Sequence, residues 1–499
     1  MKIQIKKERP GSYKGELLIG IVTQSEVQTS LKGKPLEALS GLRKDFKSLF
    51  NRKRFKGKGG EVCSIDDVTS SIVICGWNAD EKNTSKRIDR ISQYRKLGCT
   101  IFENAKKRNA KTAGVSFGSI NIFEEENFSA FIEGLELSAY EYNLYKEKKS
   151  SENISLSSLT ILSDKKTPNK ILSYAKKIVD SVFIARDLIN MPPNDCSAKY
   201  LVEKAKEIAK ERKIKLEIFD KAKLEKIGAG ALLAVAKGSE EPPYLIKMTY
   251  KPSYKPSKVI SIVGKGITFD SGGLSIKPAG SMEDMKDDMS GAAAVLGAMN
   301  AIAQVGANVE VRAYIPTCEN MINGKAVRPG DVVKSLSGKT IEILNTDAEG
   351  RLILADALHM ADTDGADIII DLATLTGAVM VALGTRYAGL FSDDDELVEN
   401  IKKAGEYSGE KFWHMPLASE YEPLLKSRIA DLKNIGGRYG GSITAALFLK
   451  SFVKKAKWAH LDIAGVAFEE SDRGYVKKGG VGFGVATLTR FVRSFENNN

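Results

Sequence analysis

The segment Val259-Ile260-Ser261-Ile262-Val263 decides the fold class of this chain. Four of its five side chains are β-branched and apolar, so it predicts a strand that is buried on both faces. The chain then changes abruptly to a polar segment with several glycines, KGITFDSGGLSIK, at residues 265–277. Strands of this kind belong to mostly parallel sheets that are covered by helices on both faces.

The same alternation of strands and helices continues through the C-terminal two-thirds of the sequence. Strands are predicted at residues 258–264, 309–316, 368–372 and 458–463. Helices are predicted between them at residues 291–305, 351–362, 396–406 and 443–455. We therefore expect a larger α/β domain with a mixed, mostly parallel sheet.

The N-terminal part of the sequence shows a second, smaller α/β pattern. Its predicted strands are residues 16–23, 71–75, 113–117 and 159–162, and its predicted helices are residues 34–50, 83–95 and 128–145. A further helix, residues 168–189, stops at NMPPN (190–194), where two prolines prevent its continuation. We expect a smaller N-terminal domain at 1–165, a connecting helix at 166–190 and a larger domain at 191–499.

Composition and cysteine usage predict a cytoplasmic protein. Hydrophobic residues make up 42% and charged residues 28%, which excludes a disordered chain. The run without charge or proline at residues 372–385 is too short to span a membrane, which needs about 20 residues. The N-terminus lacks the apolar region of a secretory signal. Five scattered cysteines without CxxC spacing indicate reduced thiols.

The formal net charge of +12 is concentrated in the first third of the chain. Its densest part is residues 43–58, with eight lysines and arginines against Asp45 alone. Such a segment attracts the phosphates of nucleic acids, but a solvated helix face or loop has the same composition. No base-reading motif accompanies it. DNA binding therefore stays open as an alternative function.

The octapeptide NTDAEGRL at residues 345–352 carries charges at alternate positions. In an extended chain, Asp347, Glu349 and Arg351 lie on one face. Thr346 and Glu349 also have the spacing of a helix capping box, which is a purely structural explanation for part of the segment. A capping box does not explain Arg351, whose charge opposes the dipole of the following helix. The pattern favours a functional site.

Two further segments add carboxylates to this candidate site. Asp270 follows the buried strand, and Asp288 belongs to an acidic segment that also suits the first turn of a helix. With Asp347 and Glu349 they carry a formal charge of −4, which balances two divalent cations. The three histidines lie elsewhere, so oxygen ligands predominate, as in sites for Zn²⁺, Mn²⁺, Mg²⁺ or Co²⁺.

Together these motifs resemble the leucyl aminopeptidase family of cytosolic dimetal exopeptidases. The resemblance rests on NTDAEGRL, on VGKGITFDSGGLSIK (263–277) and DMSG (288–291), and on NMPPN (190–194), RPGDV (328–332), LATLTGA (372–378), GSITAA (441–446) and WAHLDIAG (458–465). It covers about residues 186–499, whereas the first 160 residues match loosely. The resemblance thus implies that 191–499 is a catalytic dimetal peptidase domain and that 1–165 is an accessory domain. Asp287 and Ser290, beside Asp288, depart from the family's pattern.

The resemblance implies two divalent metal ions, zinc or manganese, with cobalt or magnesium as alternatives. It assigns a tighter metal to Lys265, Asp270, Asp288 and Glu349. It assigns a more exchangeable metal to Asp270, Asp347 and Glu349. Lysine coordinates only as a neutral amine, and both burial and a nearby dication favour that form.

The activity implied is the release of N-terminal, preferentially leucine-like, amino acids from peptides. The family's mechanism uses a hydroxide bridging two metals as the nucleophile. Lys277 and Arg351 are implied as catalytic residues, and Arg351 also as the binding site of a bicarbonate ion. We expect a substrate pocket formed by Met285, Thr374, Gly377 and Ala464, although core packing explains these four equally well.

The resemblance also implies a homohexamer, and some bacterial relatives act as DNA-binding regulators. A phosphoryl-transfer enzyme with the same carboxylates is a third alternative, but the sequence lacks a phosphate-binding loop.

Overall fold

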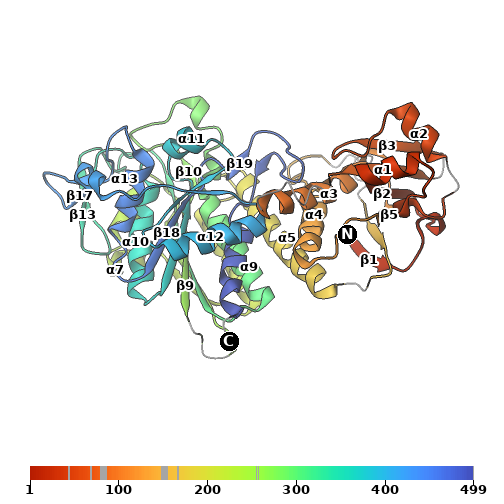
Figure 1. The fold of residues 1–499 in the computed structure, drawn as a ribbon. Coiled ribbons are helices and arrows are strands. Elements are labelled where there is room, and N and C mark those ends of the chain that lie inside the picture. Colours follow the sequence, from red (N-terminus) through yellow and green to blue (C-terminus); the bar gives the residue numbers. More distant parts are fainter. Residues whose placement is uncertain are drawn as a thin grey trace. The chain divides into compact units, whose positions relative to one another are not determined.

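The computed structural model of the chain describes residues 1–42, 45–67, 70–78, 87–147, 156–165, 168–253, 256 and 258–497. The chain divides into two compact units, which are coloured by sequence in Figure 1. Unit 1 comprises Met1–Val179 and Arg473–Val476, and unit 2 comprises Asp180–Asp472 and Lys477–Asn499. The division falls within helix α5 (Asn169–Asn190). Across the described residues, no helix combines the length and the apolar character needed to cross a membrane.

Unit 1 is a six-stranded sheet with helices. The strands lie in the order β1-β6-β5-β2-β4-β3, and all neighbours are parallel except β3 and β4. Their bounds are β1 (Lys2–Lys6), β2 (Leu17–Thr23), β3 (Val62–Asp66), β4 (Ser71–Trp77), β5 (Thr112–Phe117) and β6 (Ser158–Leu162). The helices are α1 (Gln24–Leu31), α2 (Phe46–Lys53), α3 (Arg87–Lys107) and α4 (Glu125–Leu137). The predicted small α/β domain is confirmed.

The predicted helix at 34–50 is wrong over most of its length. Among the described residues from 34 to 45, the one helical element is a short 3-10 turn, Glu37–Leu39, because Pro35 lacks a backbone N–H and Gly41 adopts a positive φ of 82°. Parts of three predicted segments lie outside the described residues. They are residues 43–44 of the basic segment, 83–86 of the helix predicted at 83–95 and 166–167 of the connecting helix. The basic side chains on and after α2 (Lys47, Arg52, Lys53, Arg54, Lys56 and Lys58) are all exposed.

Unit 2 is built on a nine-stranded mixed sheet. Its order is β16-β15-β18-β14-β9-β11-β8-β7, and β10 also pairs with β11. The bounds are β7 (Lys215–Phe219), β8 (Tyr244–Tyr250), β9 (Val259–Gly264), β10 (Gly266–Asp270), β11 (Glu310–Asn320), β14 (Ile368–Ala373), β15 (Ala388–Phe391), β16 (Phe412–His414) and β18 (Lys457–Asp462). The central strands β18, β14, β9 and β11 are parallel. The pairs β7–β8, β8–β11 and β15–β18 are antiparallel, whereas β15 and β16 are parallel.

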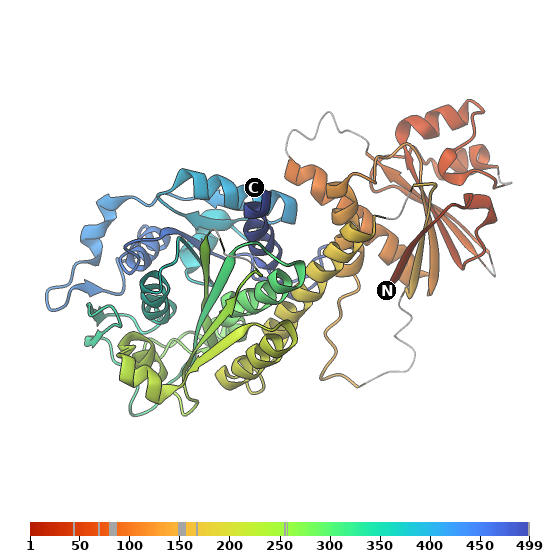
Figure 2. The ribbon, with the colours of Figure 1, turned by 90° about the horizontal axis from the view of Figure 1, so that it is seen from below.

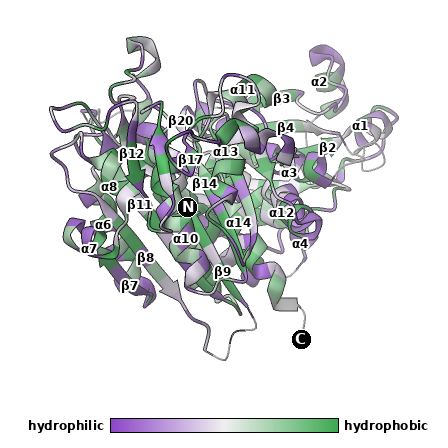
Figure 3. Cartoon of the chain, turned by 90° about the vertical axis from the view of Figure 1, so that its left-hand side faces the viewer, coloured by the Kyte–Doolittle hydropathy of each residue, from purple (hydrophilic) through white to green (hydrophobic). Residues whose placement is uncertain are grey.

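Helices cover both faces of this sheet, as Figures 1 and 2 show. On one face α9 (Ser290–Val305) packs against α6 (Ala198–Arg212) and α14 (Val485–Arg493), with α12 (Asp395–Ser408) beyond α14. On the other face α10 (Gly350–Thr363) packs against α8 (Gly230–Ala236) and α13 (Gly441–Lys450). Figure 3 shows hydrophobic residues along β9 and β11 between these layers. The predicted mostly parallel sheet with two helical layers is confirmed.

Smaller elements complete unit 2. A three-stranded sheet contains β12 (Asp331–Lys334), β13 (Thr340–Ile343) and β17 (Leu432–Lys433), and β19 (Phe468–Glu469) pairs with β20 (Gly479–Gly480). The remaining helices are α7 (Lys221–Ile227) and α11 (Gly377–Leu383). The parallel strands β9, β10, β11, β14 and β18 end at one edge of the large sheet, which is where open α/β sheets place their ligands.

A buried carboxylate of α10 holds the start of α8. Helix α8 follows Ala229, which has no side chain that can cap it. Asp356 replaces the cap, because its Oδ2 accepts a hydrogen bond from Leu232 N at 2.9 Å and its Oδ1 accepts one from Leu336 N at 2.7 Å. Burial raises the pKa of Asp356 from 3.8 to about 7, although these backbone bonds oppose the shift.

This shift predicts a pH-dependent contribution to stability. Because folding raises the pKa, the contribution of Asp356 is fully present below about pH 4 and is lost as pH rises through 7. The difference in free energy of unfolding between wild type and Asp356→Asn should therefore fall from pH 4 to 7, by at most about 1.4 kcal/mol per pH unit. Urea unfolding at several pH values measures it. A difference that is constant or rises over this range contradicts the assignment.

Candidate metal centre

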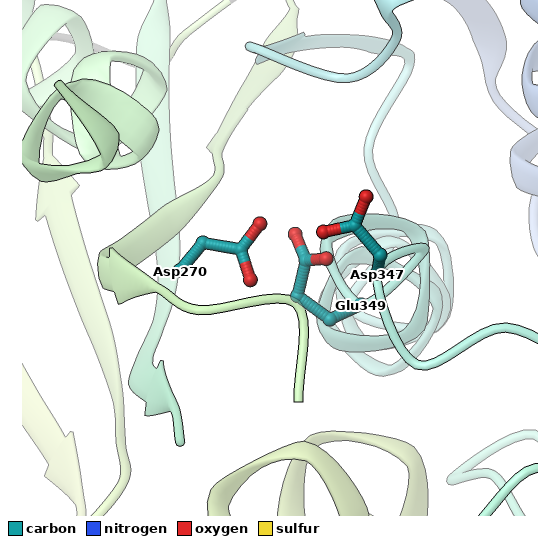
Figure 4. Close-up of side chains that lie close together, drawn as sticks. All are labelled: Asp270, Asp347 and Glu349. Carbon is teal, nitrogen blue, oxygen red and sulfur yellow. The ribbon is translucent and has the colours of Figure 1, made fainter. Parts of the chain in front are cut away.

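Three carboxylates converge at the edge of the large sheet where its parallel strands end (Figure 4). Asp270 is the last residue of β10, and Asp347 and Glu349 lie in the segment that leads into α10. One carboxylate oxygen of each lies within 4.8 Å of the others. The structure thus brings together three of the four carboxylates singled out from the sequence, from segments more than 70 residues apart.

The segment that carries Asp347 and Glu349 is a turn and not an extended strand. Asn345 Oδ1 accepts a hydrogen bond from Asp347 N at 2.8 Å, and Glu349 already has helical backbone angles. The prediction that Asp347, Glu349 and Arg351 share one face of an extended chain is therefore wrong. The turn is what brings the first two carboxylates together.

The predicted capping box of Thr346 and Glu349 is also wrong. Glu349 makes no side-chain cap to α10. The hydroxyl of Thr346 instead donates to Gly272 O at 2.6 Å and accepts from Ser275 N at 2.8 Å. Thr346 therefore joins the turn to the glycine-containing segment that follows Asp270.

Lys265, which lies between β9 and β10, is surrounded by acceptors. Its Nζ lies 2.6 Å from Asp288 Oδ1, 2.9 Å from Glu349 Oε1 and 2.9 Å from Thr374 O. Only 4% of its side chain is exposed. Burial opposes the charge, but the coulombic effects of Asp288, Glu349 and Asp270 outweigh it and raise the pKa of Lys265 above its ordinary value. Lys265 therefore joins Asp288, the fourth carboxylate, to the other three.

Lys277 makes a second pair of ion bridges. Its Nζ lies 2.8 Å from Asp270 Oδ2 and 2.6 Å from Asp347 Oδ1. Burial opposes its charge as well, but Asp270 and Asp347 raise the pKa of Lys277. Four carboxylates and two ammonium groups leave a formal charge of −2 at the site.

The donor set fits divalent cations. Burial raises the pKa values of Asp270, Asp288 and Asp347, so an additional cation would stabilise their charged forms. Within the part of the chain that the structure describes, Asp288 Oδ2 and Glu349 Oε2 are buried without a hydrogen-bond partner. Buried oxygens of this kind are costly unless they bind a cation, and hard divalent ions prefer them.

At two glycines of the site, an added side chain would collide with Lys265 or Asp347. A Cβ on Gly350 would lie 2.4 Å from Lys265 Cε and 2.7 Å from its Nζ. Gly272 has a φ of 86°, which side chains disfavour, and a Cβ there would lie 2.8 Å from Asp347 Oδ1. Neither position can therefore carry a side chain without displacing a residue of the site.

Arg351 lies in the first turn of α10 and is 7% exposed. Its Nη1 donates to Asn434 O at 2.8 Å, and its Nε has no hydrogen-bond partner among the described residues. Burial lowers the pKa of Arg351 to about 10, against the opposite effects of Glu349 and Asp462. The guanidinium thus stays charged at neutral pH and keeps a donor that suits a small anion.

The four residues expected to form the substrate pocket lie on several elements. Met285 begins a 3-10 helix and Ala464 follows β18, and both are half-buried. Gly377 is exposed at the start of α11. The hydroxyl of Thr374 donates to Asp288 Oδ1 at 2.7 Å, so Thr374 orients the carboxylates.

Sequence reasoning missed two buried asparagines. Asn320 ends β11, and its Nδ2 donates to Asp270 Oδ1 at 2.7 Å and to Thr346 O at 3.0 Å. A polar residue at the end of a buried strand was the available signal. Asn434 follows β17 and bonds to the segment that precedes α10, and no local pattern marks it.

Comparison with known families identifies similar sequences over both units. Residues 183–489 match the profile of the catalytic domain of the cytosol aminopeptidase family. Residues 19–149 match the profile of the N-terminal domain of the same family.

Curated relatives and solved structures agree with this match. The chain is 42% identical to a probable cytosol aminopeptidase of a Cyanothece strain, covering 94% of this chain and 95% of the relative. It is 40% identical to one from Alkaliphilus oremlandii, covering 99% and 100%. A mutant of tomato leucine aminopeptidase superposes with a TM-score of 0.86 at 36% identity, covering 99% and 96%. The bottromycin maturation enzyme BotP in complex with Mn gives 0.84 at 32%, covering 97% and 100%.

The contact between Gly350 and Lys265 predicts the effect of a single methyl group. Gly350→Ala should displace the Lys265 amine and weaken the binding of Mn²⁺ to these carboxylates by about 10-fold or more, as for other residues that orient ligands. Gly324→Ala is the control, because a Cβ there meets no atom within 4 Å. Isothermal titration of the two metal-stripped variants with Mn²⁺ measures the affinity of each. Unchanged affinity in Gly350→Ala would show that Lys265 is not constrained as described.

Proposed function

This chain belongs to the cytosol aminopeptidase family of metallo-aminopeptidases, and we propose that it releases leucine-like N-terminal residues by a two-metal hydrolytic mechanism. The observation that carries the proposal is the arrangement of four carboxylates around Lys265 and Lys277. A peptide bond is stable enough in water that its hydrolysis needs an activated nucleophile and stabilisation of the developing negative charge.

Five residues would hold the metals. The tighter ion would use Lys265, Asp270, Asp288 and Glu349, and the more exchangeable ion Asp270, Asp347 and Glu349. Two such ions would supply a hydroxide nucleophile at neutral pH and would polarise the substrate carbonyl, with the free α-amine of the substrate as a further ligand. The donors suit Zn²⁺ or Mn²⁺, with Co²⁺ or Mg²⁺ as alternatives. Mn in the complex of BotP supports manganese.

Lys265 has to lose a proton to act as a ligand. In the structure its Nζ is held by Asp288 and Glu349, the same carboxylates that would share its metal. Binding of a metal would therefore replace these two ion pairs by coordination of the same three side chains. The three segments would therefore stay in place both when Lys265 is protonated and when a metal ion is bound.

Lys277 is suited to stabilise the carbonyl oxygen of the substrate. Its raised pKa keeps it protonated, and 15% of its side chain is exposed, so the ammonium group can reach a substrate. Hydrogen bonds from Nζ to the oxygen strengthen as negative charge develops in the transition state. The pairs with Asp270 and Asp347 hold the amine in position for this role.

Arg351 would bind a bicarbonate ion through its planar guanidinium. The unpartnered Nε and the N-terminus of α10 both favour a small anion at this place. Bicarbonate would supply a base for the proton of the attacking water. None of the four carboxylates is free for this role, because all of them are assigned to cations.

A preference for leucine-like residues is supported by the apolar side chains of Met285 and Ala464 and by the open position at Gly377. The solved tomato relative is a leucine aminopeptidase. Thr374 contributes by orienting Asp288.

The homohexamer, a cytoplasmic location and DNA binding stay predictions. Exposed apolar side chains on unit 2, such as Val381, Ile429 and Tyr439, support association between copies. The five buried free cysteines and the name of the relatives support the cytoplasm. The exposed basic residues of α2 (Phe46–Lys53) support phosphate binding, but a solvated helix face accounts for them equally well.

Loss of a shared ligand should abolish activity with little effect on folding. Glu349→Gln and Asp270→Asn each remove the charge of a carboxylate assigned to both metals, so hydrolysis of a leucyl amide should fall by about 10³-fold or more. Both variants should retain the circular dichroism spectrum of the wild type. Glu399→Gln, on the exposed surface of α12, is the control and should keep full activity. Near-normal turnover in either ligand variant contradicts the assignment.

The proposed role of Arg351 predicts a link to bicarbonate. Arg351→Ala should lower turnover of a leucyl amide by about 10²-fold to 10⁴-fold, as expected for loss of one proton-transfer group. In carbonate-depleted buffer, added bicarbonate should stimulate the wild type but not the variant. Arg351→Lys keeps the charge without the planar fork and should respond weakly. An equal response of wild type and Arg351→Ala would make Arg351 a structural residue.

A further inference from the structure

Asn434 lies at the point where the small sheet of unit 2 meets the candidate metal centre. It follows β17, and its backbone N donates to Glu342 O at 2.9 Å, so it extends the pairing of β17 with β13. The residue is 0% exposed. It is separated by more than 80 residues from the segment that carries Asp347.

The side-chain amide of Asn434 spans the turn that precedes α10. Its Oδ1 accepts from Leu344 N at 2.9 Å and from Asn345 N at 3.3 Å. Its Nδ2 donates to Asn345 O at 2.7 Å and, more weakly, to Ala348 O at 3.4 Å. The buried amide therefore bonds to main-chain donors and acceptors on both sides of Asp347.

The backbone carbonyl of Asn434 has a separate partner. It accepts the hydrogen bond from Arg351 Nη1 at 2.8 Å. One buried residue thus holds the chain before and after Asp347 with its side chain, and holds the guanidinium of Arg351 with its main chain. Asp347 and Glu349 lie between these attachment points.

Only an amide meets both requirements of the turn. A carboxylate at position 434 has no donor for Asn345 O and would place a negative charge against that carbonyl. An apolar side chain leaves the N–H of Leu344 and the carbonyl of Asn345 without these partly buried hydrogen bonds, so the turn loses its attachment to β17.

We infer that Asn434 is a positioning residue for the metal centre. Its side chain fixes the position of Asp347, and its backbone carbonyl fixes the position of Arg351. The inference rests on the proposed two-metal function, in which Asp347 belongs only to the more exchangeable metal. Loss of the amide should therefore lower the affinity for that metal more than the affinity for the tighter metal. The ligands of the tighter metal are held in place by Lys265.

The test compares Asn434→Ala with Asn300→Ala in isothermal titrations of the metal-stripped full-length protein with Mn²⁺. Asn300 is a matched control, because it is also a buried amide of unit 2, and it bonds to Ser181 Oγ and Arg212 Nε away from the carboxylates. In Asn434→Ala the weaker Mn²⁺ site should lose about 10-fold to 100-fold in affinity. The tighter site, and both sites of Asn300→Ala, should stay within about threefold.

Asn434→Asp covers the case in which Asn434→Ala does not fold, because it keeps the acceptor for Leu344 N, although it replaces the donor to Asn345 O with a negative charge. It should also weaken the second site. Wild-type Mn²⁺ affinity at both sites in a folded Asn434 variant, or an equal loss in Asn300→Ala, overturns the inference. A wild-type protein that binds fewer than two Mn²⁺ ions instead overturns the proposed function and this inference with it.

Discussion

The contact of the Lys265 amine with Asp288 and Glu349 is the interaction on which the rest of the site depends. Buried carboxylates repel one another, and they stay charged only if cations lie between them. Lys265 supplies one such cation from the end of β9, and it reaches α10 because Gly350 has no side chain. Three segments that are far apart in the sequence are held together by this one amine.

The large sheet makes this arrangement possible. Its parallel strands end at one edge, so Lys265, Asp270, Asn320 and Thr374 all lie where a strand has just finished. The hydrogen bonds of Asn320 and Thr374 then orient the carboxylates. A rigid scaffold with adaptable loops at one edge is the usual basis for a site in an α/β protein. Removing one orienting partner therefore leaves the sheet intact and disturbs the ligands.

Much of the fold follows from patterns within short windows. Apolar runs such as residues 259–263 predicted the central strands, and those strands agree with the structure to within a few residues. The carboxylates are recognised as well, because NTDAEGRL carries charges at alternate positions and Asp270 and Asp288 bring the formal charge of the set to −4. The helix at 34–50 was predicted wrongly, since Pro35 and Gly41 interrupt an otherwise helical pattern.

The contacts between distant segments could not be predicted. Thr346 has the spacing of a capping box, and only its approach to Gly272 and Ser275 shows that it joins two loops. Asn434 shows no periodicity or motif at all, since its partners lie about 90 residues earlier in the chain. Interactions of this kind depend on tertiary packing and become visible only in three dimensions.

The central claim, that two divalent ions at this site perform the hydrolysis, is tested most directly by titrating activity with metal. The protein is stripped by chelation, and its rate on a leucyl amide is followed as Mn²⁺ or Zn²⁺ is added back. The account predicts no hydrolysis by the stripped protein, recovery that is complete only at two equivalents per chain, and rates that differ between metals. Full activity after stripping, or saturation at one equivalent, would contradict it.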